Sequence, residues 1–238
     1  MKVRLLFQFS LIFFSTCIYA QGVNSEIVLD SQAEDTLSSD SYIHISYFSA
    51  FRTFKDESSN KKYSKRLDEK AISTSGIEIG KIIKINQQFN FSIGVTFFGG
   101  GESYQYSDNV TDSTFYYKNV YHQIGIPIRL NFEMGNKVKG FVFAGVVPAS
   151  ILHRRYESNY TDEKGKIFEN EIETFKNDLA MFQISGSFGG GIKYSFKNTT
   201  LYAMGEYRPY FSNTYTGLFL SHQMRLIGGS FGMIYSFK

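Results

Sequence analysis

The chain of 238 residues has one cysteine, no tryptophan, three prolines and four histidines. The single cysteine, Cys17, lies within a stretch typical of a removable export signal. The mature chain is therefore expected to contain neither a disulfide nor a thiol nucleophile. Beyond the N-terminus, no run approaches the roughly 18 consecutive apolar residues that a membrane-spanning helix needs. Phe and Tyr, in contrast, are abundant. They make the chain 17% aromatic, and this excess needs a structural explanation.

The N-terminal stretch "MKVRLLFQFSLIFFSTCIYAQG" has a basic start, an apolar run and a small residue before Gln21. These features predict a secretory signal peptide over 1–20, with cleavage after Ala20. Lipidation at Cys17 is the alternative, although "FSTC" lacks the usual residues of a lipidation signal. Cleavage removes two bases and lowers the formal net charge from +3 to +1, which gives no electrostatic argument for nucleic-acid binding.

The segment that follows, 21–40, carries five acidic residues and no basic ones. It has few large apolar side chains, so it cannot bury enough surface to fold alone. We predict a flexible periplasmic leader there, with a docking tail for a basic partner as the alternative.

The stretch "HQIGIPIRLNFEM" (122–134) alternates with a period of two residues. Apolar side chains occupy the even positions and polar or small ones the odd positions, which indicates a strand with two different faces. Pro127 lacks a backbone N–H, so a bulge or a missing hydrogen bond is expected there. Seven further segments share the period, and the predicted strands are 41–54, 71–85, 88–106, 122–134, 140–156, 180–196, 200–211 and 221–238.

The connections between these strands alternate between short polar turns and long polar loops. The long ones cover 55–70, 107–115, 157–179 and 212–220. This alternation predicts an all-β fold over 41–238: a transmembrane antiparallel up-and-down β-barrel, with eight strands, short periplasmic turns and long extracellular loops. A soluble β-sandwich is the alternative. The even strand count, the loop asymmetry and the small residues on the polar face oppose it, because small residues suit a narrow barrel interior.

Aromatic residues gather near the predicted strand ends, as in the girdles of membrane barrels. We expect Phe89, Phe132, Phe141, Phe196 and Phe237 on the periplasmic side, and Tyr104, Tyr106, Tyr116, Tyr156 and Phe211 on the outer side.

Several of these strands resemble a known family. "IGIPIRLNFEMGNKVKGFVFAGVVPA" resembles the core of the PorT-like outer-membrane β-barrel family, and "GSFGGGIKYSF", "GEYRPYFSN" and "GGSFGMIYSF" resemble its last three strands. The resemblance covers about residues 120–238. It implies localisation in the outer membrane of a Gram-negative bacterium of the Bacteroidota type. The family includes a component of the type IX secretion machinery, but many more members have no assigned activity, so the resemblance implies a location more firmly than a function.

Charged residues on the predicted inner face are the most informative polar set. A charge buried alone is costly, so we expect them to pair in a network inside the barrel. A proton or solute path is the alternative, although an eight-stranded barrel is narrow enough for side chains to fill. The predicted interior network comprises Glu78, Arg129, Glu133, Lys193, Glu206 and Arg208.

No motif predicts catalysis, a metal site or a cofactor. Ser221 and His222 are adjacent and would point to opposite faces of a strand. "FFGGGE" and "FGGGIK" lack the helix and the Lys-Ser/Thr pair of a phosphate loop, so glycine kinks in a curved wall are the better interpretation. We therefore expect a non-enzymatic protein.

Two long loops carry opposite charge. Residues 55–70 hold six bases and four acids, whereas 157–178 hold seven acids and three bases. We expect them to pair with each other or to contact a partner protein or lipopolysaccharide. The leading functional hypothesis is a monomeric outer-membrane module that supports or docks an envelope assembly, with type IX protein secretion as the candidate. A surface adhesion or host-interaction barrel is the alternative, and a lipid-modifying enzyme is third.

Overall fold

The computed structural model describes residues 39–55, 68–107, 113–174, 181–214 and 221–236. The predicted signal peptide, residues 21–38 of the predicted leader and residues 56–67 of the basic loop lie outside the described residues. Within the described residues, no helix has the length and apolarity to cross a membrane.

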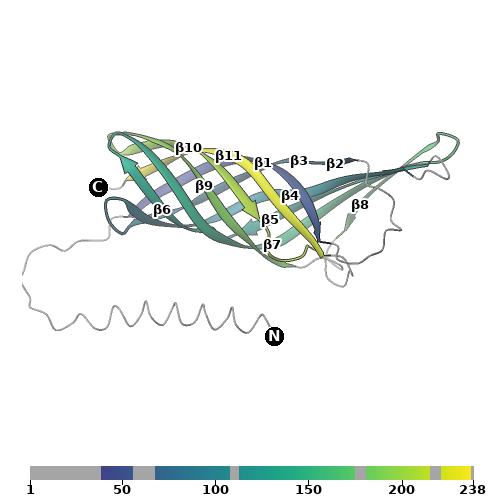
Figure 1. Cartoon of the computed structure of the whole chain (residues 1–238), viewed down its shortest axis with the longest axis horizontal. Coiled ribbons are helices and arrows are strands. Elements are labelled where there is room, and N and C mark those ends of the chain that lie inside the picture. The colour runs from purple at the N-terminus through teal and green to yellow at the C-terminus, as the bar shows by residue number, and fades with distance from the viewer. Residues whose placement is uncertain (1–38, 56–67, 108–112, 175–180, 215–220, 237–238) are drawn as a thin grey trace, which may run out of the picture. The chain divides into compact units, whose positions relative to one another are not determined.

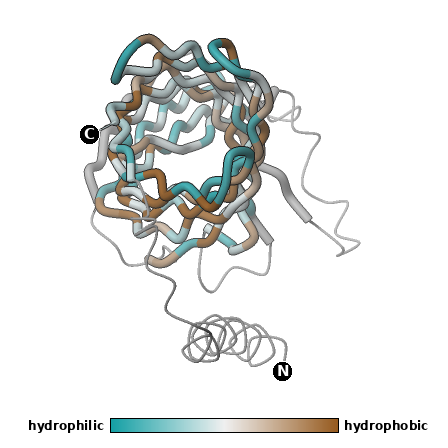
Figure 2. Tube along the Cα trace, turned by 90° about the vertical axis from the view of Figure 1, so that its left-hand side faces the viewer, coloured by the Kyte–Doolittle hydropathy of each residue, from teal (hydrophilic) through white to brown (hydrophobic). Residues whose placement is uncertain are grey.

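The strands form one antiparallel sheet that closes on itself (Figures 1 and 2). Each wall strand pairs with the next along the chain. The pairing of the first with the last, from Asp40 opposite Ser236 to Lys55 opposite Ser221, completes the ring. The predicted eight-stranded up-and-down barrel is confirmed. Its wall consists of β1 (Ser39–Lys55), β3 (Ile72–Lys84), β4 (Phe89–Ser107), β5 (Thr114–Gly125) continued by β6 (Ile128–Gly135), β7 (Val138–Thr161), β9 (Phe182–Phe196), β10 (Thr199–Pro209) and β11 (Ser221–Ser236).

Pro127 interrupts the fourth wall strand, as the sequence predicts. β5 ends at Gly125 and β6 begins at Ile128. Residues 126 and 127 are nevertheless hydrogen-bonded to both neighbouring strands. The Ile126 N–H donates to the Pro148 carbonyl at 2.9 Å, and the Gly94 N–H donates to the Pro127 carbonyl at 3.2 Å. The wall therefore stays closed where the ladder is broken.

Part of the sheet continues beyond the barrel on the long-loop side (Figure 1). Two short strands, β2 (Asp68–Lys70) and β8 (Ile167–Thr174), pair with the extended ends of β4 and β7 there. The prediction of a long loop over 157–179 is therefore wrong for 157–161 and 167–174. Acidic residues at every second position of β8 lowered the apolar contrast that marked the other strands. We call the part of the sheet formed by β2, β8 and the adjoining ends of β4, β5 and β7 the projecting sheet.

The two faces of the wall differ in chemistry. Side chains alternate between lumen and exterior along each strand. The exterior residues are mainly large and apolar, and many of them are at least 37% exposed. An apolar exterior of this extent is unusual for a protein surface in water. The band includes Ile43, Ile45, Ile77, Ile79, Val95, Phe97, Ile124, Ile126, Leu130, Val142, Val146, Ile184, Phe188, Ile192, Ile227 and Phe231.

Side chains fill the middle of the lumen. One apolar cluster, which includes Phe48, Phe98 and Leu226, packs toward the long-loop end. A second, which includes Phe141, Phe143 and Tyr202, packs toward the short-turn end. Phe141 is 6% exposed inside the barrel, so its predicted place in the periplasmic girdle is wrong. The fifth predicted strand has indistinct faces in the sequence, and the β6–β7 register assigns Phe141 to the lumen.

Gly80 is a position where the wall has no room for a side chain. A Cβ there would lie 2.3 Å from the Ile93 carbonyl oxygen and 2.7 Å from the Tyr42 ring. We expect Gly80→Ala to lower the free energy of unfolding by about 1–3 kcal/mol through overpacking. Gly140→Ala is the matched control, because nothing lies within 4 Å of its Cβ position. Urea unfolding followed by circular dichroism measures both, and equal midpoints would contradict the packing of Tyr42 against β3.

Candidate functional site: a charge network inside the barrel

Four charged side chains meet in the middle of the lumen. Glu78 lies on β3, Arg129 on β6, and Glu206 and Arg208 on β10. All four are no more than 4% exposed. The strand alternation directs them inward, and the narrow barrel brings residues from separate strands into contact. Two carboxylates and two guanidinium groups make the set formally neutral, which is the condition for burying charge at tolerable cost.

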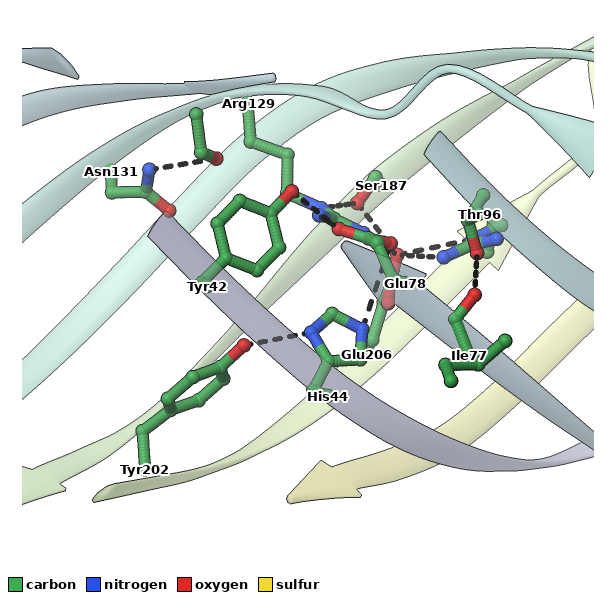
Figure 3. Close-up of polar contacts among 12 residues, drawn as sticks. Tyr42, His44, Ile77, Glu78, Thr96, Arg129, Asn131, Ser187, Tyr202 and Glu206 are labelled. Atoms are coloured by element: carbon green, nitrogen blue, oxygen red, sulfur yellow. Dashed lines mark hydrogen bonds and ion pairs between the residues drawn. The ribbon is translucent and has the colours of Figure 1, made fainter. Parts of the chain in front are cut away.

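Arg129 is the centre of this set (Figure 3). Its guanidinium donates two hydrogen bonds to the Glu78 carboxylate, from Nη1 to Oε1 and from Nη2 to Oε2, the latter at 3.0 Å. Nη2 also lies 3.4 Å from Oε1 of Glu206. Nε donates to the Ser187 hydroxyl at 2.8 Å, and this hydroxyl donates to Glu206 at 2.7 Å. One guanidinium thus connects strands from opposite parts of the wall, and this bidentate geometry requires arginine.

Arg208 supplies the second positive charge and is itself almost fully buried. Its Nε and Nη2 donate to the same Glu206 oxygen at 3.0 and 2.9 Å. Its guanidinium carbon lies 4.7 Å from the ring centroid of Phe98 and 5.1 Å from that of Phe48. These cation–π contacts join the charge network to the apolar cluster on the long-loop side.

Two tyrosines and a histidine complete the network (Figure 3). Sequence reasoning did not single them out. Tyr42 donates to Glu78 at 2.8 Å. His44 lies 2.8 Å from the Tyr202 hydroxyl through Nδ1 and 3.6 Å from Glu78 through Nε2. The alternation of the first predicted strand could have identified Tyr42 and His44, because their even positions place both on its polar face.

The other two predicted interior residues form a separate cluster nearer the short turns. Lys193 donates to Glu133 at 2.5 Å, and Asn90 donates to the same carboxylate at 2.7 Å. Lys139 approaches its second oxygen at 3.3 Å. Lys84, which shares the inner parity of Glu78, lies at the rim and pairs with Asp40 at 3.0 Å. The six predicted charges therefore divide into a central set of four and a mouth set of two.

The arrangement favours a structural role for the network. A carboxylate can orient a histidine that acts as a general base, but His44 is only 3% exposed and packs against the Tyr42 and Tyr202 rings. On the barrel exterior His122 stacks against His153, with ring centroids 5.8 Å apart. The side chain of His222 lies outside the described residues. Among the side chains that the structure describes, no group of three or more potential metal ligands occurs.

Fold and network together define a closed eight-stranded antiparallel β-barrel with an apolar exterior and a lumen that side chains close in its middle. No family model and no curated protein matches the chain. Similar solved structures include Neisserial surface protein A, with 14% identity, a TM-score of 0.40 and coverage of 83% of this chain and 97% of that one. OprG from Pseudomonas aeruginosa has 9% identity, a TM-score of 0.43 and coverage of 84% and 96%. Ail of Yersinia pestis has 13% identity, a TM-score of 0.31 and coverage of 82% and 99%. The PorT-like resemblance stays a prediction.

Proposed function

We propose that this chain is a bacterial outer-membrane β-barrel, without enzymatic activity, that docks an envelope assembly. The observation that carries the location is the apolar exterior, because an aqueous surface of Ile, Val and Phe around a whole barrel would aggregate, whereas lipid solvates it. A closed barrel also satisfies all backbone groups at membrane depth, since it has no free edge there.

The filled lumen supports docking rather than transport. Two apolar clusters and the Glu78–Arg129–Glu206 network lie between the two ends of the barrel. An eight-stranded barrel packed in this way has no aqueous path. We expect the purified protein to show no steady ion conductance in planar bilayers above that of the lipid alone. Step-like currents from the unaltered protein would contradict the sealed lumen.

The PorT-like resemblance supports type IX protein secretion as the process that the docked assembly serves. The deciding experiment is deletion of the gene in its native host, followed by measurement of exported enzymes and by affinity purification of the protein from gently solubilised outer membranes. We expect export to fall and secretion components to co-purify. Normal export together with an empty pull-down would overturn the secretion proposal.

The projecting sheet favours cell-surface adhesion as a second candidate. One of its faces carries aromatic rings in contact, with Tyr117 5.5 Å from Tyr104 and 6.1 Å from Tyr156 between centroids, and Tyr160 6.2 Å from Phe168. Tyr160 and Phe168 are exposed and the other three rings are half-buried, and surface clusters of Tyr and Phe are typical of interaction surfaces. Normal export combined with lost binding of cells to a host surface after deletion would favour this candidate over secretion.

A further inference from the structure

A cavity of about 820 Å³ lies in the short-turn end of the barrel and is distinct from the central charge network. We call it the mouth cavity. Its lining comes from eight strands and the turns between them, and it is mostly polar. Amide and hydroxyl side chains contribute as well as charges. The lining residues include Asp40, Lys84, Asn86, Gln87, Gln88, Asn90, Glu133, Asn136, Lys139, Lys193, Ser195, Lys197, Thr200 and Ser236.

The mouth cavity has more positive than negative charge. Lys139 and Lys193 lie directly opposite each other in the β7–β9 register, an arrangement that is unfavourable for two like charges. Both ammonium groups approach the single carboxylate of Glu133, at 3.3 and 2.5 Å. One carboxylate offsets only one of these two charges.

The remaining charged residues of the lining do not correct this imbalance. Lys84 pairs with Asp40 at 3.0 Å. Lys197 adds a fourth ammonium group from the β9–β10 turn, where its φ of 52° fixes a tight bend. The described lining therefore contains four lysines against two acids. Confinement between low-dielectric walls strengthens the attraction of such a surplus for an anion.

The mouth cavity is closed at its inner end. A void of only about 30 Å³ lies beyond it, lined by residues that include Lys193 and Arg129. Arg129 is held there by Glu78 and Ser187, so a molecule that enters from the short turns cannot continue through the barrel. The cavity is therefore a blind cup, suited to holding a ligand and unsuited to passing one.

We propose that the mouth cavity is a binding site for the carboxylate groups of an acidic, extended peptide segment of a periplasmic partner. The cation surplus selects negative charge, and the amides and hydroxyls suit a peptide backbone. The volume is far larger than an inorganic anion requires. A lipid headgroup is disfavoured because Lys139 and Lys193 line the lumen side of the wall, whereas Ile192 and Val142 face outward. That the mouth cavity opens to the periplasm rests on the proposed function, whereas the binding of an acidic peptide does not.

The test uses the full chain in zwitterionic detergent and a fluorescent peptide of six glutamates, with a six-glutamine peptide as the reference probe. Fluorescence anisotropy should show binding of the glutamate peptide alone, and binding should weaken as salt rises. Lys139→Gln and Lys197→Gln should each weaken it about tenfold, the effect of one lost hydrogen bond to a charged group. Lys166→Gln, at the other end of the molecule, should leave it unchanged.

Carbodiimide cross-linking and mass spectrometry should then place the bound peptide on Lys139 or Lys197. No binding, equal weakening by Lys166→Gln, or cross-links confined to the long-loop end would overturn the proposal. Displacement of the peptide by phosphatidylglycerol micelles but not by phosphatidylcholine micelles would assign the site to lipid headgroups instead. Unheated and boiled gel mobility shows that each variant is folded. Because binding is measured in detergent, a failure of the outer-membrane location would appear separately in cell fractionation.

Discussion

Arg129→Met should lower the free energy of unfolding by about 3–5 kcal/mol, the usual cost of removing one partner from a buried charge network. Methionine keeps an unbranched stem but removes every hydrogen bond that Arg129 donates to Glu78, Glu206 and Ser187. Glu78 then keeps only Tyr42 and the more distant His44 as partners. Urea unfolding in lipid vesicles, followed by circular dichroism because the chain has no tryptophan, measures the loss.

A partly exposed ion pair at the surface provides the matched control. Lys118 lies 3.8 Å from Glu157 on the projecting sheet, and its side chain is 35% exposed. Lys118→Met should cost no more than about 1 kcal/mol. The double variant Glu78→Met with Arg129→Met should recover part of the loss, because it removes the carboxylate left without its main partner. A loss no larger than that of Lys118→Met would contradict a stabilising network at the centre of the barrel.

Ile126→Arg should impair insertion and lower the free energy of unfolding by about 2–4 kcal/mol, as charges on the lipid face of a barrel do near the membrane midplane. Ile126 lies between β5 and β6, is 48% exposed and belongs to the apolar exterior. The fraction of protein that reaches the fast-migrating folded form in vesicles measures insertion, and urea unfolding measures the free energy.

Ile167→Arg is the matched control for this substitution. Ile167 is even more exposed, at 62%, but it begins β8 on the projecting sheet, beyond the barrel wall. The same arginine should be nearly neutral there, and Ile126→Leu should also be tolerated. Equal losses for Ile126→Arg and Ile167→Arg would show that exposure alone, and not contact with lipid, sets the cost.

The alternation of residues predicted the barrel because a period of two is a local property of the chain. In the stretch 122–134, Pro127 alone was enough to predict the interruption between β5 and β6, because proline has no backbone N–H to donate to the neighbouring strand. The hairpin of β7 and β8 was missed for a local reason too: Glu169, Glu171 and Glu173 replace the apolar residues that marked the other strands. A polar strand alternates as regularly as an apolar one, but the contrast between its faces is weak.

The contacts inside the lumen could be predicted only in part. Parity placed Glu78, Arg129, Glu206 and Arg208 on the inner face. It could not show that Lys193 and Glu133 lie nearer the mouth, because height along the barrel depends on strand tilt and stagger. Parity also places Phe48 and Phe98 on this inner face, but it could not show that their rings pack together and close the lumen.

The central claim is that the apolar exterior contacts membrane lipid. A fluorophore attached to a single cysteine in place of Ile45, Ile79 or Ile126, with Cys17 replaced, tests it directly in vesicles that contain nitroxide-labelled acyl chains. We expect strong quenching at these three positions and little at Ile167. Equal fluorescence with and without the nitroxide lipid at Ile45, Ile79 and Ile126, or quenching as strong at Ile167, would contradict the account.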